Sequence, residues 1–207
     1  MPEGDLPSPK DAAAALRAAV HDLASKSVSI EPDGAALGRA AELVRLAAAE
    51  IDGEPFGRWW EGPSESREEL GLRHYRHRSI FQGELHPFSP TLRWQDAAGP
   101  AGEPGYRFVV ELSSLYEGPP NAVHGGYVAA LFDELLGGVQ ALAEGGGGYT
   151  GRLTVRYRSL TPVRQPLDFV GWISDDKGRR VHTHATCHAS GVLCAEAEAL
   201  FVRPATP

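Results

Sequence analysis

The sequence predicts an α+β fold, in which one long apolar helix packs against an antiparallel sheet. The first observation is a helical run over residues 127–144, whose apolar side chains recur every three or four positions. The second is the clean alternation of apolar and polar side chains over residues 150–160, which is typical of a strand. The third is a hairpin turn signal at residues 175–178, between two strand-like runs.

The chain before the first strand reads as a separate part. Residues 1–55 predict a helical N-terminal extension, with helices over residues 11–24 and 35–51 and Asp11 as the first N-cap. Residues 56–78 read as a linker, and residues 79–207 as the main domain. The strands expected in that domain cover residues 79–85, 91–95, 106–115, 150–160, 167–174, 179–190 and 192–202.

Composition narrows the class of protein. With 27 acidic and 20 basic residues the net charge is −7, which argues against a nucleic-acid binder. Cys187 and Cys194 lack CxxC spacing and read as free thiols of a reducing compartment. The N-terminus shows no secretory signal, so we expect a cytoplasmic protein. The apolar helix carries Asp133 and Glu134 at its centre, so we expect no membrane span.

Two features of the helical run point to chemistry. Burying a carboxylate without partners costs several kcal/mol. The adjacent carboxylates Asp133 and Glu134 in an apolar helix are therefore candidates for a functional role. Gly125 and Gly126 leave backbone N–H groups approachable at the helix start, where partial positive charge suits an oxyanion. A carboxylate beside an oxyanion site is what attack of water on a carbonyl requires.

The run from Glu117 to Asp133 resembles the signature of hotdog-fold acyl-CoA thioesterases of the PaaI-like class. In that family a His-Gly-Gly opens the central helix and an Asp follows the His by nine positions, as Asp133 follows His124. The strand beginning near Thr150 also resembles the family's strand after the helix. The resemblance implies a long helix wrapped by a curved antiparallel sheet, an acyl-CoA substrate with no other cofactor, and a homodimer.

The resemblance also assigns roles. Asp133 is the expected general base or water-orienting carboxylate, and Glu134 is the alternative. The Gly125 N–H is the expected oxyanion donor, and His124 either holds that turn or contacts the thioester. Thr150 matches the hydroxyl position, although strict alternation turns it away from the helix unless Gly151 forms a bulge.

Further substrate contacts are expected around these groups. Gly126 and Asn121 flank the helix start, although the family often carries its Asn at the position of Gly118. Coenzyme A phosphates need cations, and a row of arginines follows the helix. The alternative for each arginine is a solvated strand face. The row comprises Arg152, Arg156 and Arg158.

His182, His184 and His188 share one strand face without a Cys or carboxylate to complete a metal set, so we expect no metal site.

Helix geometry gives one inference that does not depend on the family. Nine residues of helix separate His124 from Asp133 by about 13 Å, too far for both to reach one carbonyl carbon. If both act, they come from two copies of the helix related by a two-fold axis. We therefore expect a dimer with shared sites, and possibly a dimer of dimers.

The sequence thus predicts an acyl-CoA thioesterase that releases a free acid and coenzyme A. Two alternatives remain open: a hotdog protein that binds acyl-CoA without turnover, and, with a poorer fit to the spacing, a hotdog dehydratase.

Overall fold

The computed structural model describes residues 8–54, 78–90 and 92–204. The chain divides into two compact units, Met1–Ser89 and Pro90–Pro207, which we treat separately. The linker predicted over residues 56–78 lies almost entirely outside the described residues.

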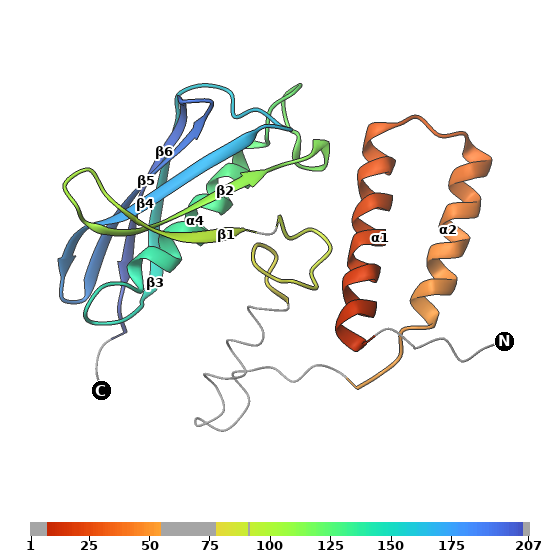
Figure 1. The fold of residues 1–207 in the computed structure, drawn as a ribbon, viewed down its shortest axis with the longest axis horizontal. Helices are drawn as coiled ribbons and strands as arrows, with labels where there is room; N and C mark the ends of the chain where they lie inside the picture. Colours follow the sequence, from red (N-terminus) through yellow and green to blue (C-terminus); the bar gives the residue numbers. More distant parts are fainter. Residues whose placement is uncertain (1–7, 55–77, 91, 205–207) are drawn as a thin grey trace. The chain divides into compact units, whose positions relative to one another are not determined.

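The first unit contains a helical hairpin formed by α1 (Pro9–Ser29) and α2 (Gly34–Ala49), as predicted (Figure 1). The N-cap of α1 is Ser8, so the prediction of Asp11 was wrong. The Ser8 hydroxyl accepts the Asp11 N–H at 3.2 Å, and Pro9 fits the first turn because it has no N–H to satisfy. Asp33 caps α2 in the same way, accepting the Ala36 N–H at 2.8 Å.

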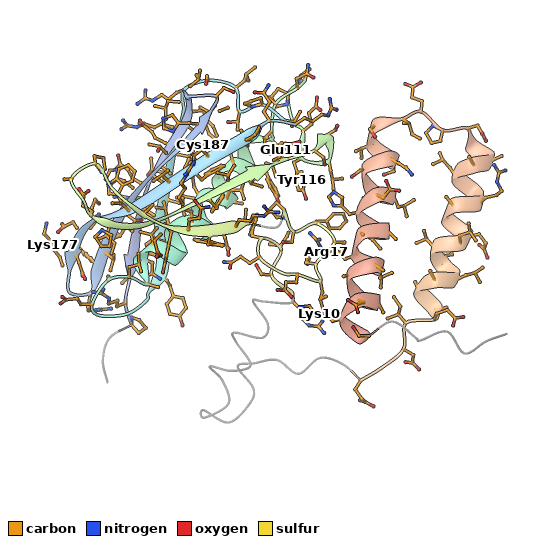
Figure 2. All side chains as sticks on the ribbon, viewed as in Figure 1. Lys10, Arg17, Glu111, Tyr116, Lys177 and Cys187 are labelled. Carbon is orange, nitrogen blue, oxygen red and sulfur yellow. The ribbon has the colours of Figure 1, made fainter. Side chains whose placement is uncertain are left out.

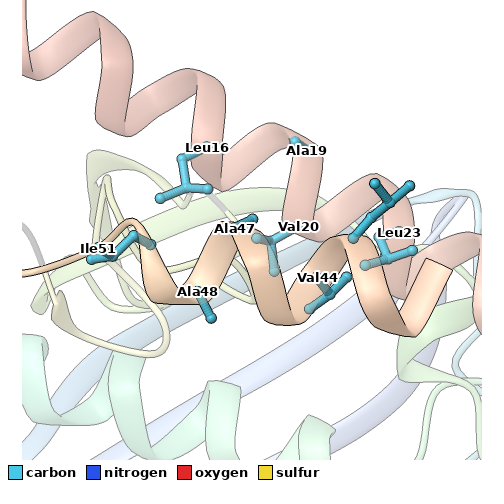
Figure 3. A pocket seen from close by; sticks show the side chains of 9 residues that line it. Leu16, Ala19, Val20, Leu23, Val44, Ala47, Ala48 and Ile51 are labelled. Atoms are coloured by element: carbon cyan, nitrogen blue, oxygen red, sulfur yellow. The ribbon is translucent and has the colours of Figure 1, made fainter. Parts of the chain in front are cut away.

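An apolar groove of about 310 Å³ separates the two helices. Figure 3 shows aliphatic side chains of α1 and α2 lining it from both sides, among them Val20 and Val44. The apolar side chains of this groove remain largely open to solvent. Helix α2 contains no buried residue, and Leu43 in the groove is 67% exposed.

Residues 79–85 form turns, so the strand predicted there was wrong. Ser79 explains the difference, because its hydroxyl accepts the N–H groups of Phe81 and Gln82 and its carbonyl accepts the Gly83 N–H at 2.8 Å. The side chain of Arg17 of α1, labelled in Figure 2, stabilises the turns over residues 86–89. Its guanidinium donates to the carbonyls of His86 and Ser89 at 3.0 and 2.7 Å.

The second unit is a six-stranded antiparallel sheet with one helix, which confirms the predicted α+β hotdog fold. The strands are ordered β1-β2-β4-β5-β6-β3, so β1 and β3 are the edges. Six of the seven predicted strands form, the last with its predicted ends and the other five with shifted ends. Their bounds are Arg93–Ala98 (β1), Pro104–Glu111 (β2), Tyr149–Tyr157 (β3), Pro166–Lys177 (β4), Arg180–Ala189 (β5) and Val192–Val202 (β6).

The central helix α4 (Gly125–Gln140) lies along one face of the curved sheet, following the short 3-10 helix η1 (Ser114–Tyr116) (Figure 1). Its apolar side chains meet the inward-facing side chains of β2, β4, β5 and β6. Phe132 and Phe108, for example, both contact the ring of Phe169, each with centroids 5.1 Å apart. The core therefore lies between this helix and the sheet, and it holds α4 in place.

Both cysteines are buried free thiols, as predicted. Burial raises the pKa of the Cys187 thiol far above its ordinary value, so this group stays protonated and unreactive. In the part of the chain that the structure describes, no helix is long and apolar enough to cross a membrane.

Candidate active site

The helix starts at Gly125, at the two glycines that the sequence placed at its start, and His124 is its N-cap; it ends at Gln140, four residues before the predicted end. The imidazole Nδ1 of His124 accepts the Gly126 N–H at 3.0 Å. An accepting Nδ1 carries no proton, so the proton of the neutral ring is on Nε2. His124 therefore holds the helix start, which was one of its two expected roles, and the residue is exposed.

The loop before the helix is fixed by backbone hydrogen bonds. The His124 N–H donates to the Tyr116 carbonyl and the Val123 N–H to the Thr161 carbonyl, both at 2.8 Å. Asn121 lies in the loop with a positive φ of 60°, a conformation that Asn adopts more readily than most residues. Its N–H donates to the Glu117 carboxylate at 2.7 Å, so Asn121 shapes the loop through its backbone.

Two tyrosines pack beside the helix start. The rings of Tyr116 and Tyr127 have centroids 4.5 Å apart. Burial, with a smaller contribution from Tyr116, raises the pKa of the Tyr127 phenol far above its ordinary value. Tyr127 is therefore a neutral phenol in the physiological pH range.

The two glycines at the helix start differ in what their N–H groups do. The Gly126 N–H is used by the His124 cap. Among the described residues no acceptor is paired with the Gly125 N–H, which is the first donor of the helix. The available donor is thus the one that the sequence assigned to the oxyanion.

Asp133 is the exposed carboxylate of a helix whose other faces are largely buried. Its Oδ1 accepts a hydrogen bond from the Thr150 hydroxyl at 3.0 Å. The register of β3 against β6 shifts between Thr150 and Arg152, so the bulge that the sequence allowed at Gly151 is present. Because of that bulge, Thr150 lies opposite the buried Phe201, on the side of the sheet that faces the helix.

Glu134 lies about 100° further round the helix than Asp133. It is half-buried and takes part in an interaction of its own. The two neighbouring carboxylates therefore stand in different environments, and only Asp133 occupies the open face of α4.

The arginine row is on the other side of the sheet. Arg156 lies opposite Glu196 of β6, and Arg152 lies opposite Leu200, while the buried Ala197 and Ala199 between these partners face the helix. Arg158 forms an ion pair with Glu196. Within one chain, the structure does not bring these arginines to Asp133.

The three histidines of β5 lie on this same outer face. His184 stacks on Trp172, with ring centroids 6.1 Å apart, and lies opposite Glu198. No group of three or more His, Cys, Asp or Glu residues in the described parts of the chain is arranged to hold a metal ion.

Sequence reasoning missed the contact of Tyr157 with the helix start. The Tyr157 hydroxyl donates to the Gly125 carbonyl at 2.7 Å. The alternation of β3 does put Tyr157 on the same face as Leu153 and Val155. Nothing in the pattern, however, shows which end of the helix that face meets.

It also missed the two side chains that fix the glycine loop between α4 and β3. Gln140, a buried amide at the end of an apolar helix, accepts the Gly148 N–H at 2.7 Å. The Arg203 guanidinium donates to the Gly146 carbonyl at 2.9 Å and pairs with Asp176. A polar amide on a buried helix face next to four glycines was the available signal for Gln140.

The sequence was compared with protein families and with curated proteins. No family model matches the sequence. An 89-residue stretch, 42% of this chain, is 34% identical to the acyl-coenzyme A thioesterase THEM4 of Xenopus laevis. The match spans 40% of that protein, less than half of its length.

Solved structures extend the comparison to nearly the whole chain. A thioesterase superfamily protein superposes with a TM-score of 0.72 at 26% identity, covering 92% of this chain and 94% of its own. Zebra fish thioesterase superfamily member 2 superposes with a TM-score of 0.53 at 14% identity, covering 66% and 97%, and it shows the fold alone. The chain thus has the hotdog fold and is similar to thioesterase superfamily proteins, as its His-Gly-Gly motif and strand pattern predicted.

Proposed function

We propose that this chain is an acyl-CoA thioesterase, in which Asp133 activates or orients the attacking water. The observation that carries the proposal is the Thr150–Asp133 hydrogen bond of 3.0 Å on the open face of a helix that is otherwise packed into the core. Thr150 reaches Asp133 only because a bulge interrupts the strand. A carboxylate held by a hydroxyl and open to solvent is suited to accept a proton from water.

The position of Asp133 favours it over Glu134 as the base. The helix face that carries Asp133 also carries Gly126, Ala130 and Gly137, which follow one another at helical spacing. Such small side chains leave room for a substrate or a second helix against this face. Glu134 points away from that face by about 100°.

The oxyanion donor is the Gly125 N–H of a second copy. Gly125 and Asp133 of one chain are separated by eight helical rises, or about 12 Å, so they do not meet at one carbonyl. Two antiparallel α4 helices across a two-fold axis bring Asp133 of one copy toward Gly125 of the other. Such an arrangement is compatible with the sheet, because β3 is an edge strand and leaves one side open to a second copy.

Hydrolysis in this site proceeds in two steps, addition of water and collapse of the tetrahedral intermediate. A water oxygen bonds to the thioester carbon while its proton passes to Asp133, and the carbonyl oxygen becomes an anion against the Gly125 N–H. The tetrahedral intermediate collapses, the carbon–sulfur bond breaks, and the proton passes to the departing thiolate. The products are a free acid and a thiol, and the step needs no metal or redox cofactor.

Coenzyme A as the thiol rests on the THEM4 relative and on the sequence motif. Its phosphates need cations, and the arginines on β3 are the nearest candidates in sequence. Because Arg152 and Arg156 lie on the outer face, they would have to serve a site formed with another copy.

Thiol release from a panel of short, long and aromatic acyl-CoAs tests the proposal. We expect turnover by the wild type and a fall in kcat of about 10²–10⁴-fold for Asp133→Asn, which keeps the shape but loses the base. Asp96→Asn on the edge strand β1 is the matched control and should keep wild-type turnover. The mass of Asp133→Asn in solution should remain that of the wild-type dimer.

Other outcomes would replace the proposal. Full activity of Asp133→Asn with loss of activity in Glu134→Gln would move the base to Glu134. Binding of acyl-CoA without thiol release across the panel would identify a non-catalytic binding protein. Hydration of an enoyl thioester would instead identify a dehydratase.

A further inference from the structure

The proposed oxyanion donor lies in the most flexible pair of residues in the motif. Gly125 and Gly126 have no side chains to restrict their φ and ψ angles. A catalytic donor is effective when it already points at the position of the developing charge, so that nothing needs to reorganise during the reaction. These two glycines therefore need to be held by their neighbours.

The structure shows how the peptide group between them is held. Its carbonyl, that of Gly125, accepts the Tyr157 hydroxyl at 2.7 Å. Its N–H, that of Gly126, donates to His124 Nδ1 at 3.0 Å. Since a peptide group is planar and rigid, two hydrogen bonds at its opposite ends fix its orientation.

The preceding peptide group is held from one end only. Its carbonyl, that of His124, accepts the N–H groups of Tyr127 and Val128 at 2.9 and 3.1 Å. Its other end is the Gly125 N–H, for which the described residues provide no acceptor. The Gly125 N–H thus belongs to a peptide group held at its carbonyl end, directly before the Gly125–Gly126 peptide that is held at both ends, and it points out of the helix start.

The Tyr157 ring also packs on Gly125. A Cβ built on Gly125 would lie 3.4 Å from Cζ and Oη of Tyr157, which is van der Waals contact. Tyr157 itself is 52% exposed, so its ring covers the glycine while its outer side is open. The hydroxyl is held close to the carbonyl by a ring that has little room to move inward.

We propose that Tyr157 is a positioning residue, whose hydroxyl holds the Gly125–Gly126 peptide so that the Gly125 N–H is pre-organised for the oxyanion. This inference rests on the proposed thioesterase function. Each β3 then serves two shared sites, one at each end: Thr150 holds the carboxylate of one site and Tyr157 holds the oxyanion donor of the other. A shift of this one strand would disturb both groups together.

Tyr157→Phe tests the proposal, because it removes the hydroxyl and keeps the ring. We expect kcat to fall about three- to tenfold with KM unchanged, the effect of losing one hydrogen bond that acts in the transition state. Tyr149→Phe is the matched control on the same strand and should keep the wild-type kcat. An unchanged kcat in Tyr157→Phe, or a loss shared equally by Tyr149→Phe, would overturn the proposal.

A second readout separates this inference from the proposed function. Amide exchange, followed by NMR in the full-length protein, should become faster at Gly126, whose N–H donates to His124, in Tyr157→Phe, while the amides around Thr150 keep their rates. If the wild type shows no thiol release, the proposed function fails, yet the exchange rates still report whether Tyr157 holds the glycines. Unchanged exchange at Gly126 would show that the hydroxyl does not hold the Gly125–Gly126 peptide.

Discussion

Helices α2 and α4 are each 16 residues long and rich in apolar side chains, yet they differ in how far these side chains are buried. In α4, seven residues are buried, and Leu131, Phe132 and Leu135 are 0% exposed. In α2 no residue is buried, and Leu43 and Leu46 are 67% and 58% exposed. The difference lies in what each helix packs against.

A sheet of six strands surrounds one side of α4, whereas a single helix and a groove flank α2. Apolar periodicity predicts both helices equally well, because it reports only the local conformation that would gather apolar side chains on one side. It does not report whether a partner surface exists.

The largest difference should come from truncating one leucine in each helix. Leu135→Ala removes a 0% exposed side chain and should cost about 2–5 kcal/mol in the free energy of unfolding of its unit. Leu43→Ala should change the stability of the hairpin by no more than about 0.5 kcal/mol. Hydrogen exchange read by mass spectrometry as a function of urea measures the two units separately. Equal losses would mean that α2 is covered as completely as α4.

An intermediate difference is expected for glycines inside the two helices. A Cβ on Gly138 of α4 would lie 2.9 Å from the Trp94 ring, so Gly138→Ala should destabilise the unit by about 1–3 kcal/mol. Gly38 of α2 has open space around it, and Gly38→Ala should stabilise the hairpin by about 0.5–1 kcal/mol.

Gly137 is the control for this pair, since it lies in α4 with nothing within 4 Å of a built Cβ. Thermal melts of Gly137→Ala should therefore resemble those of Gly38→Ala in sign. Destabilisation by Gly137→Ala would show that the helix rather than the contact with Trp94 sets the effect.

The smallest difference is expected in how the stability of the two units depends on pH through one ion pair in each, Arg203–Asp176 and Arg45–Glu42. The hydrogen bond from Arg203 lowers the pKa of Asp176 below its ordinary value, and the side chains of this pair are 10% and 29% exposed. Because the carboxyl binds a proton more weakly in the folded state, its contribution is present above the unfolded pKa of about 3.9 and is lost as the pH falls through the lower folded value.

Urea midpoints between about pH 2 and pH 6 measure this linkage. The acid loss of stability should be smaller in Asp176→Asn than in the wild type. In α2, Arg45 and Glu42 form a pair with side chains 72% and 64% exposed, and Glu42→Gln should leave the pH profile unchanged. A profile altered equally by both variants would remove the distinction between the two pairs.

Much of the candidate site followed from sequence because its signals are local. The spacing from His124 to Asp133 is a property of one helix, and the role of Gly151 follows from a conflict between alternation and motif. The roles of Tyr157 and Arg203 could not be predicted, because their hydrogen-bond partners Gly125 and Gly146 lie 32 and 57 residues away in the sequence. No periodic pattern encodes a contact between the end of a strand and the start of a helix.

The sequence by itself determined the helices, six strands, the glycine-opened helix start and the two neighbouring carboxylates, since hydrogen bonding and apolar periodicity within a segment specify these. Only the tertiary structure decided that residues 79–85 turn back on Ser79, that Asp133 rather than Glu134 occupies the open face of α4, and that β3 holds both Thr150 and Tyr157 against that helix. These outcomes depend on which surfaces meet, and burial against a surface is a property of the folded chain as a whole.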